Sequence, residues 1–299
     1  MNIFNKALVT VLPIFPKSFI SLFSRRYIAG ETLAEAIEVT EQLNRQNMRT
    51  TIDVLGENIT RLEEAQAMKQ ICLQVLDAID EHKLNANLSI KLTQLGLKLD
   101  KQVCLENVRE LVERARGYRN FVRIDMEDST CTDDTIDIYL QLHATYDNVG
   151  TVIQAYLKRS VDDVRMLIAK GANLRICKGI YDESPKIAYK NRNVIRNNFM
   201  QLVKLMLDAD CYVGIATHDP TLIARSYQYI HEKQIDKSRY EFQMLLGVSE
   251  DLRKQIINDG HKLRVYVPFG EQWYPYSMRR LKENPRIAGY ILKNLFQKG

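Results

Sequence analysis

The 299-residue sequence lacks the cysteine and histidine patterns of a disulfide framework or a metal site. It has five cysteines, an odd number, and no two of them form a C-x-x-C pair. None of its five histidines stands four residues from another, as two ligands on one helix face would. We therefore expect no disulfides and no bound metal, and the cysteine usage is typical of a reducing cytosol.

The sequence also lacks an apolar run long enough to span a bilayer. Its most apolar segment covers residues 2–23, and Pro13, Pro16 and Lys17 interrupt it well short of the ~20 residues that a spanning helix needs. Positive charges follow the apolar part and no small-residue cleavage site is present, which argues against a signal peptide. Two interpretations stay open: a helix packed under the main domain, or a peripheral membrane contact.

No basic tract, low-complexity segment or Gly/Ser-rich linker is present. The net charge of +5 is spread along the chain, which suits an anionic ligand or an acidic membrane surface and gives no reason to expect a nucleic-acid partner. Without a linker, we expect one domain over residues 1–299, with N-terminal helices in 1–48 and the main fold in 49–299.

What the sequence does contain is an alternation of short apolar runs with longer amphipathic stretches. Eight runs are typical of strands: 51–56, 88–92, 121–126, 151–156, 173–178, 212–217, 240–245 and 263–267. Helical spacing fills segments such as 59–82 and 195–210, with one extra helix at 31–47 and the final helices at 276–297. Strands that alternate with helices predict a parallel sheet, and eight units favour closure into an α/β fold of the (β/α)₈ TIM-barrel type. No G-x-G-x-x-G follows any run, which counts against a dinucleotide-binding Rossmann domain.

Polar side chains stand in or just after all eight predicted strands, where the active sites of barrels lie. They are Glu57, Lys91, Asp125, Gln154, Arg175, Thr217 with His218 and Asp219, Gln243, and Tyr266. Buried charges are costly unless they are paired or bound, so the pattern predicts a pocket. The alternative is a ring of mutually satisfied ion pairs, such as Lys91 with Asp125.

The adjacent Arg279 and Arg280 project about 100° apart near a helix start that we expect just after Pro275. Two guanidinium groups can hold one carboxylate from two sides. Tyr276 shares the face of Arg279, and Glu283 lies within one turn of both arginines. Local spacing alone leaves a surface Arg–Glu pair equally open.

Several segments, in this order, resemble the proline dehydrogenase family, above all its compact bacterial monofunctional type. They are SIKLTQLG (89–96), RIDMEDS (123–129), VIQAYLKR (152–159), LRICKGIY (174–181), ATHDP (216–220), YEFQMLLG (240–247) and RVYVPFGEQWYPYSMRRLKEN (264–284). The resemblance implies a distorted (β/α)₈ barrel with extra N-terminal helices. It also implies FAD-dependent oxidation of L-proline to Δ¹-pyrroline-5-carboxylate, with electrons passing to a membrane quinone.

The resemblance also implies roles for single residues. For the reaction it points to Lys91, Asp125 and Arg175. For the substrate pocket it points to Lys91, Asp125, Tyr181, Leu245, Tyr266, Tyr276, Arg279, Arg280 and Glu57. For FAD it points to Gln154, Arg175, Cys177, Lys178, Gly179, Ile180, Thr217, His218, Asp219 and Glu283. A cytoplasmic protein, peripheral on the inner face of the cell membrane, would fit these roles.

Three of these positions depart from the family pattern: Cys177 stands where an aliphatic residue is typical, Ile180 where a small one is, and Asp219 where Asn is. They would tune the pocket and the flavin rather than change the reaction. Tyr276 favours proline over hydroxyproline, for which Ser would be expected there. Two other functions remain open: a (β/α)₈ lyase or aldolase with Lys91 or Lys178 as a Schiff-base amine, and a barrel that only binds an amino acid.

Overall fold

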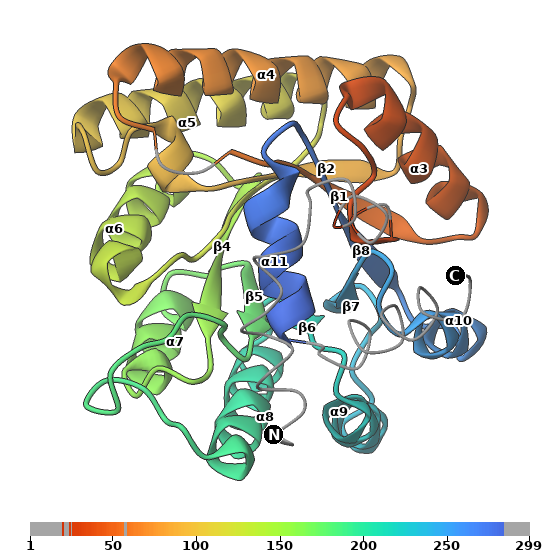
Figure 1. Ribbon diagram of the computed structural model, residues 1–299. Helices are drawn as coiled ribbons and strands as arrows, with labels where there is room; N and C mark the ends of the chain where they lie inside the picture. Colours follow the sequence, from red (N-terminus) through yellow and green to blue (C-terminus); the bar gives the residue numbers. More distant parts are fainter. Residues whose placement is uncertain (1–19, 21–23, 25, 57–58, 284–299) are drawn as a thin grey trace, which may run out of the picture.

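The computed structural model describes residues 20, 24, 26–56 and 59–283, and for residues 279–283 it describes the backbone alone. Eight parallel strands follow one another around a closed barrel, in chain order from β1 to β8 (Figure 1). Their bounds are β1 Arg49–Val54, β2 Ala86–Ile90, β3 Val122–Ile124, β4 Val149–Gln154, β5 Leu174–Cys177, β6 Val213–Ala216, β7 Tyr240–Leu245 and β8 Leu263–Phe269. Because β1 pairs with β8 as well as with β2, the sheet is closed and the predicted (β/α)₈ barrel is confirmed.

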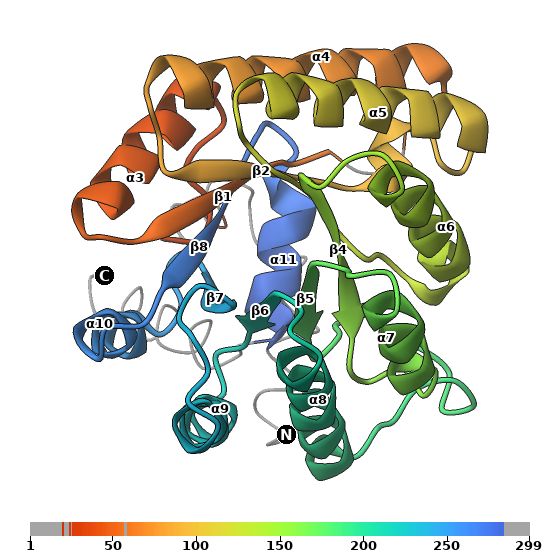
Figure 2. The ribbon, with the colours of Figure 1, turned by 180° about the vertical axis from the view of Figure 1, so that it is seen from behind.

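Helices surround the barrel on its outside (Figures 1 and 2). They are α3 Leu33–Arg45, α4 Leu62–Glu81, α5 Lys101–Gly117, α6 Thr132–His143, α7 Ser160–Ile168, α8 Arg192–Asp208, α9 Pro220–Glu232 and α10 Glu250–Asn258. The chain also forms α11 Trp273–Glu283, which is not part of this outer ring, and the short 3₁₀ turns η2 Leu92–Leu95 and η3 Ser129–Cys131. Side-chain caps define several starts: Thr32 and Glu35 form a capping box at α3, and Asp100 caps α5. The predicted helices at 31–47, 59–82 and 195–210 thus form within a few residues of their expected bounds.

Strand alternation separates an apolar outer layer from a polar barrel interior. On β7, Phe242 packs edge-on against Tyr227 of α9, whereas Glu241 and Gln243 take part in polar contacts with side chains of other strands. The apolar layer between strands and helices is closed to solvent, as the fully buried Ile52, Leu88 and Val122 show. Burial of this layer stabilises the fold at roughly 25 cal/mol per Å² of apolar surface, so the barrel can hold charged groups inside.

Helix α11 lies over the carboxyl ends of the strands (Figure 1), which places it at the end of the barrel where a site is expected. It begins at Trp273, three residues earlier than the sequence predicted, and Pro275 fits because a first-turn residue needs no backbone N–H donor. Strand β1 ends at Val54 and not near Glu57.

Part of the N-terminal prediction and the end of the last predicted helix lie outside the described residues. Within the described part of the chain, no helix combines the length and the apolarity needed to cross a bilayer.

Candidate active site

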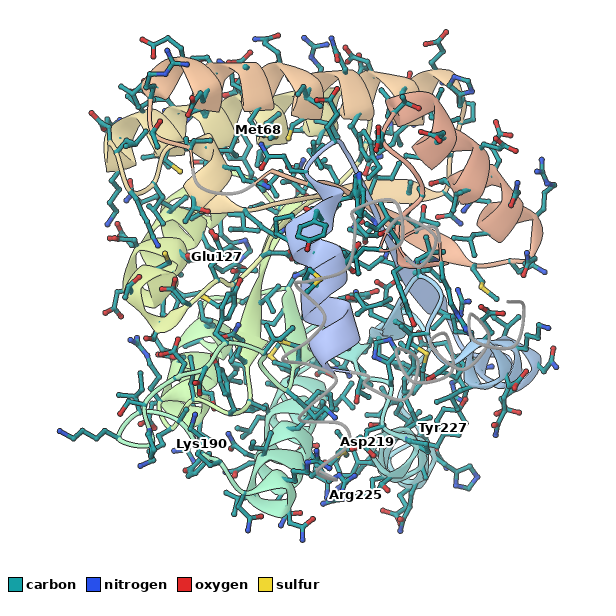
Figure 3. All side chains as sticks on the ribbon, in the orientation of Figure 1. Met68, Glu127, Lys190, Asp219, Arg225 and Tyr227 are labelled. Atoms are coloured by element: carbon teal, nitrogen blue, oxygen red, sulfur yellow. The ribbon has the colours of Figure 1, made fainter. Side chains whose placement is uncertain are left out.

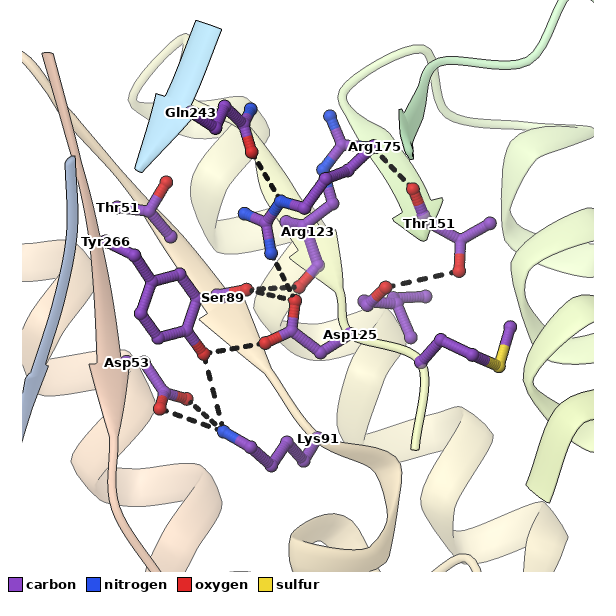
Figure 4. A network of polar contacts seen from close by, with 12 residues as sticks. Thr51, Asp53, Ser89, Lys91, Arg123, Asp125, Thr151, Arg175, Gln243 and Tyr266 are labelled. Atoms are coloured by element: carbon purple, nitrogen blue, oxygen red, sulfur yellow. Dashed lines mark hydrogen bonds and ion pairs between the residues drawn. The ribbon is translucent and has the colours of Figure 1, made fainter. Parts of the chain in front are cut away.

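Asp125, which follows β3, is the centre of a polar network at the carboxyl end of the barrel (Figure 4). Its Oδ1 accepts hydrogen bonds from Nη1 of Arg175 at 2.6 Å and from Oγ of Ser89 at 2.8 Å. Its Oδ2 accepts one from the hydroxyl of Tyr266 at 2.7 Å. The network therefore joins β2, β3, β5 and β8 through one carboxylate.

Lys91 pairs with a different carboxylate from the one that the sequence suggested. Its Nζ lies 2.7 and 2.8 Å from the two carboxylate oxygens of Asp53, and 3.5 Å from the hydroxyl of Tyr266. The example of a Lys91–Asp125 ion pair is thus wrong, because β1 brings Asp53 to Lys91 while Arg175 takes Asp125. The ammonium lies inside a charge pair, so it is a poor candidate for the free amine that a Schiff base requires.

Asp53 is a residue of the site that sequence reasoning missed. Its side chain is fully buried. Burial raises the pKa of Asp53 to about 6, with Lys91 opposing the rise and Asp125 adding to it. The signal was a single carboxylate inside the apolar run TIDVLG (51–56), which is rare in a strand unless the charge has a partner.

Tyr266 keeps its proton in this surrounding. Burial first, and then the nearby Asp125 and Asp53, raise the pKa of the phenol well above its ordinary value. The neutral hydroxyl can therefore donate to Asp125, and the guanidinium of Arg175 lies 5.4 Å from the centre of the Tyr266 ring. The ring and the two charged groups thus hold one another in place.

Gln154 and Gly179 were both predicted to lie near a cofactor. Gln154 ends β4 and pairs in register with Cys177, the last residue of β5, and Gly179 follows two residues later. The Gln154 side chain is buried and its Nε2 donates to the carbonyl of Met126 at 3.2 Å, while its Oε1 has no partner among the described residues. Gly179 has φ +98°, and a Cβ there would lie 2.1 Å from the ring of Tyr156. A glycine is therefore required at 179, and Gln154 has a free acceptor for a donor from outside.

The loop from β6 to α9 brings together the three residues predicted from ATHDP. Asp219 caps the start of α9 (Figure 3) and lies 2.7 Å from Nε of Arg196 and 3.5 Å from Nζ of Lys178. Burial alone would raise its pKa, but these two cations outweigh burial and the pKa of Asp219 ends below its ordinary value. Thr217 accepts from the backbone of Asp219, and Nε2 of His218 accepts from the backbone N–H of Leu245 at 2.8 Å. Through this hydrogen bond His218 connects the loop to the end of β7.

The remaining predicted residues lie around the same end of the barrel. Cys177 is half-buried at the end of β5, and burial raises the pKa of its thiol to about 11, so it stays protonated. Ile180 is 43% exposed, and Tyr181 and Leu245 are half-buried.

Helix α11 carries the last predicted residues. Tyr276 is buried in a cluster with Tyr27 and Leu55. Arg279, Arg280 and Glu283 belong to α11, but their side chains, and all of Glu57, lie outside the described part. Among the described residues, no group of three or more His, Cys, Asp or Glu side chains could hold a metal ion.

Comparison with known proteins gives one consistent result. A sequence profile described as proline dehydrogenase matches residues 36–291. "Proline dehydrogenase 1" of Bacillus subtilis (strain 168) is 39% identical over 277 residues, which cover 93% of this chain and 92% of that protein. "Proline dehydrogenase" of Deinococcus radiodurans is 33% identical and covers 92% of this chain and 90% of its own length.

A solved structure supports the same assignment. Proline utilization A (PutA) from Bdellovibrio bacteriovorus, inactivated by N-propargylglycine, superposes with a TM-score of 0.82 and 26% identity. The match covers 87% of this chain and 32% of that much longer one. On these grounds the chain belongs to the proline dehydrogenase family.

Proposed function

We propose that this chain oxidises L-proline to Δ¹-pyrroline-5-carboxylate with bound FAD, in the first step of proline catabolism to glutamate. The observation that carries the proposal is the Asp125-centred network, which gathers two cations and two carboxylates at the carboxyl end of the barrel, under α11. The family match supports the reaction class, and the network supports our proposal that the reaction takes place at this end of the barrel.

The substrate's carboxylate would bind to Arg279 and Arg280 of α11. Two planar forks can each form charge-assisted hydrogen bonds with one carboxylate. Asp125 already accepts three hydrogen bonds, so its carboxylate has little capacity to accept another from a protonated amine of the substrate. The pocket therefore favours proline with a neutral nitrogen, whose lone pair must be free for oxidation at the adjacent carbon. Lys91 and Asp125 would orient the ring, and Tyr181, Leu245, Tyr266 and Tyr276 would exclude water, with Glu57 near the entrance.

The residues present fit FAD. The buried Oε1 of Gln154 lacks a protein donor among the described residues, and a flavin ring offers an N–H. Lys178, Gly179 and Ile180 follow Cys177 at the end of β5, and Thr217, His218 and Asp219 lie on the loop after β6. Glu283 would support the cofactor from α11. When bound, FAD would accept a hydride from the proline ring. The cation of Arg175 would stabilise the negative charge that results.

Two further parts of the proposal concern the surroundings of the enzyme. We propose a membrane quinone as electron acceptor, and a cytoplasmic protein in peripheral contact with the inner face of the cell membrane. We also propose a single domain over 1–299, with N-terminal helices in 1–48 and the barrel in 49–299. The strands from 49 to 269 close one barrel and α3 packs on β1 and β8, which supports this division.

The absorbance of the purified protein tests the proposal directly. We expect a yellow protein whose flavin bands bleach when proline is added without air. A colourless protein that cannot be loaded with FAD would contradict it, and a carbonyl adduct trapped by borohydride would favour the lyase alternative.

The carboxylate grip has its own test. Arg280→Met should raise the KM for proline about ten- to a hundredfold, because a charge-assisted hydrogen bond is worth roughly 1.5–3 kcal/mol, and should leave FAD bound. Arg165→Met on α7 is the matched control, since Arg165 is largely exposed and distant in the fold. An unchanged KM in Arg280→Met would remove this arginine from the site.

A further inference from the structure

Inside the barrel, two side chains of β7 are hydrogen-bonded in series to Arg175. Its Nε donates to Oε1 of Gln243 at 2.5 Å (Figure 4), and Nε2 of Gln243 donates to Oε1 of Glu241 at 2.7 Å. All three side chains are buried. Glu241 and Gln243 stand two residues apart on one strand, so both point into the barrel.

The chemistry of its two neighbours fixes the orientation of the Gln243 amide. A guanidinium has only donors, so it requires the amide oxygen. Burial alone would raise the pKa of Glu241, but Arg264 first, and then Gln243 and Arg49, outweigh it and the pKa lies below its ordinary value. The ionised Glu241 is an acceptor only, so it requires the amide nitrogen. A flipped amide would place oxygen against oxygen and nitrogen against guanidinium.

Gly214 on β6 leaves the space through which Gln243 reaches Arg175. In the sheet register Gly214 lies between its two neighbours, Arg175 on β5 and Glu241 on β7. A Cβ at 214 would lie 2.5 Å from Nε2 and 2.9 Å from Cδ of Gln243. The side-chain amide of Gln243 therefore occupies the space that a side chain at position 214 would fill. Even the methyl group of an alanine at 214 would displace this amide.

We propose that Glu241 and Gln243 are positioning residues that fix the guanidinium of Arg175 for the oxidation of proline, an inference that rests on the proposed function. Asp125 holds the group at Nη1 and Gln243 holds it at Nε, so two anchors on different strands fix its plane. Glu241 acts one step further away, by holding the Gln243 amide in its working orientation. A displacement of about 1 Å at such a group can cost about a hundredfold in rate.

The test uses the FAD-loaded protein and three variants: Gln243→Met, Gly214→Ala and Glu241→Leu, which removes the acceptor for the Gln243 amide. We expect proline to reduce the flavin about ten- to a hundredfold more slowly in Gln243→Met and Gly214→Ala, with a KM close to that of the wild type. The flavin potential should become more negative, because the cation that stabilises the reduced ring is misplaced. Thr51→Val is the matched control, since it removes another buried hydrogen bond inside the barrel, to Asn87, and should leave rate and potential unchanged.

A double variant tests the order of the chain. If Glu241 acts through Gln243, adding Glu241→Leu to Gln243→Met should slow flavin reduction no further, whereas independent effects would multiply and overturn this part. Wild-type rate and potential in whichever of Gln243→Met and Gly214→Ala folds, or in Glu241→Leu if neither does, would overturn the proposal as a whole. The flavin potential needs no proline, so a protein that binds FAD but is not reduced by proline would refute the proposed function and still test the positioning of Arg175.

Discussion

At the scale of single residues, the Asp53–Lys91 pair sets the electrostatics of one side of the site. Both groups are buried, and the pKa of Asp53 stands at about 6 although Lys91 opposes the rise. Removing water from two charges costs more than their attraction returns unless geometry and further contacts are good. A role in the site therefore explains the presence of the Asp53–Lys91 pair better than a contribution to the stability of the fold does.

Lys91→Met should destabilise the protein strongly and in a pH-dependent way. Loss of the cation raises the folded-state pKa of Asp53 beyond its present value, while the unfolded value stays near 3.8. The folded state then binds a proton that the unfolded state releases, so stability falls as the pH rises from about 4 through the folded pKa. We expect a loss of roughly 3–5 kcal/mol near pH 8 and a smaller loss near pH 5, measured by urea unfolding.

The matched control is the double variant Asp53→Asn with Lys91→Met. It removes both charges, so most of the lost stability should return and the added pH dependence should vanish. A double variant as unstable as Lys91→Met would show that packing of the lysine stem, and not an uncompensated charge, accounts for the loss.

His261 gives a second pH effect, with the opposite sign and outside the site. Burial first, and then Lys237, lower the pKa of this ring below 6.5, and Tyr240 shares a 2.8 Å hydrogen bond with its Nδ1. Between the folded and the unfolded pKa only the unfolded chain is protonated, so stability is full above about pH 6.5 and declines as the pH falls. The decline should be smaller in His261→Phe and unchanged in the control His231→Gln, which alters an exposed histidine. Equal slopes in all three proteins would exclude His261 as the cause.

The sequence predicts which residues belong to the polar network where a charge interrupts an apolar strand. It does not predict which of these residues pair with one another. Lys91, Asp125 and Arg175 all belong to the network as expected, but which carboxylate meets which cation depends on barrel register. Register is set by the closure of eight strands, and a local sequence window contains no information about it. Gln243 stood out as a polar strand residue, whereas its link to Arg175 required knowing that β6 contributes a glycine between them.

At the scale of elements, α11 lies over the carboxyl end of the barrel and is joined by hydrogen bonds to the segment before α3. Nε1 of Trp273 donates to Oε1 of Glu31 at 2.8 Å, and the buried hydroxyls of Ser277 and Ser24 are 2.8 Å apart. These contacts join residues more than 240 positions apart in the chain. The amphipathic spacing predicted that a helix forms here, but its start and its anchor depend on that distant segment.

Trp273→Phe should loosen this anchor without affecting the barrel. If α11 carries the arginines that bind the substrate carboxylate, the KM for proline should rise about two- to fivefold while FAD stays bound. This rise corresponds to a loss of roughly 0.5–1 kcal/mol in binding free energy. Glu31→Ala should act in the same way, and Glu31→Gln should resemble the wild type because its amide oxygen can still accept the indole N–H. Steady-state kinetics on the four proteins decide the matter, and a normal KM in both Trp273→Phe and Glu31→Ala would show that this contact does not position α11.

At the scale of the whole molecule, the barrel combines an apolar layer under its helices with an interior that holds buried charged side chains. The outer layer of buried Val, Ile and Leu supplies stability, and this part of the fold could be predicted because strand and helix periodicity act locally. The interior holds Asp53, Arg123, Arg175 and Glu241 in almost complete burial. Such groups are costly to bury even when they are paired, so the protein without a cofactor should be less stable than its apolar core alone would allow.

Cofactor loading should therefore change the stability of the molecule as a unit. FAD that binds only the folded state stabilises it by about 2.7 kcal/mol at a free concentration one hundred times its Kd. For a domain of this size that corresponds to a rise in Tm of about 5 °C. Calorimetry of FAD-stripped protein with increasing FAD should show this concentration-dependent rise. Gly179→Ala should reduce it, because its Cβ would collide with the Tyr156 ring beside the proposed cofactor site. A Tm that is independent of added FAD would contradict FAD binding to the folded chain. A rise unaffected by Gly179→Ala would remove only the loop after β5 from the cofactor site.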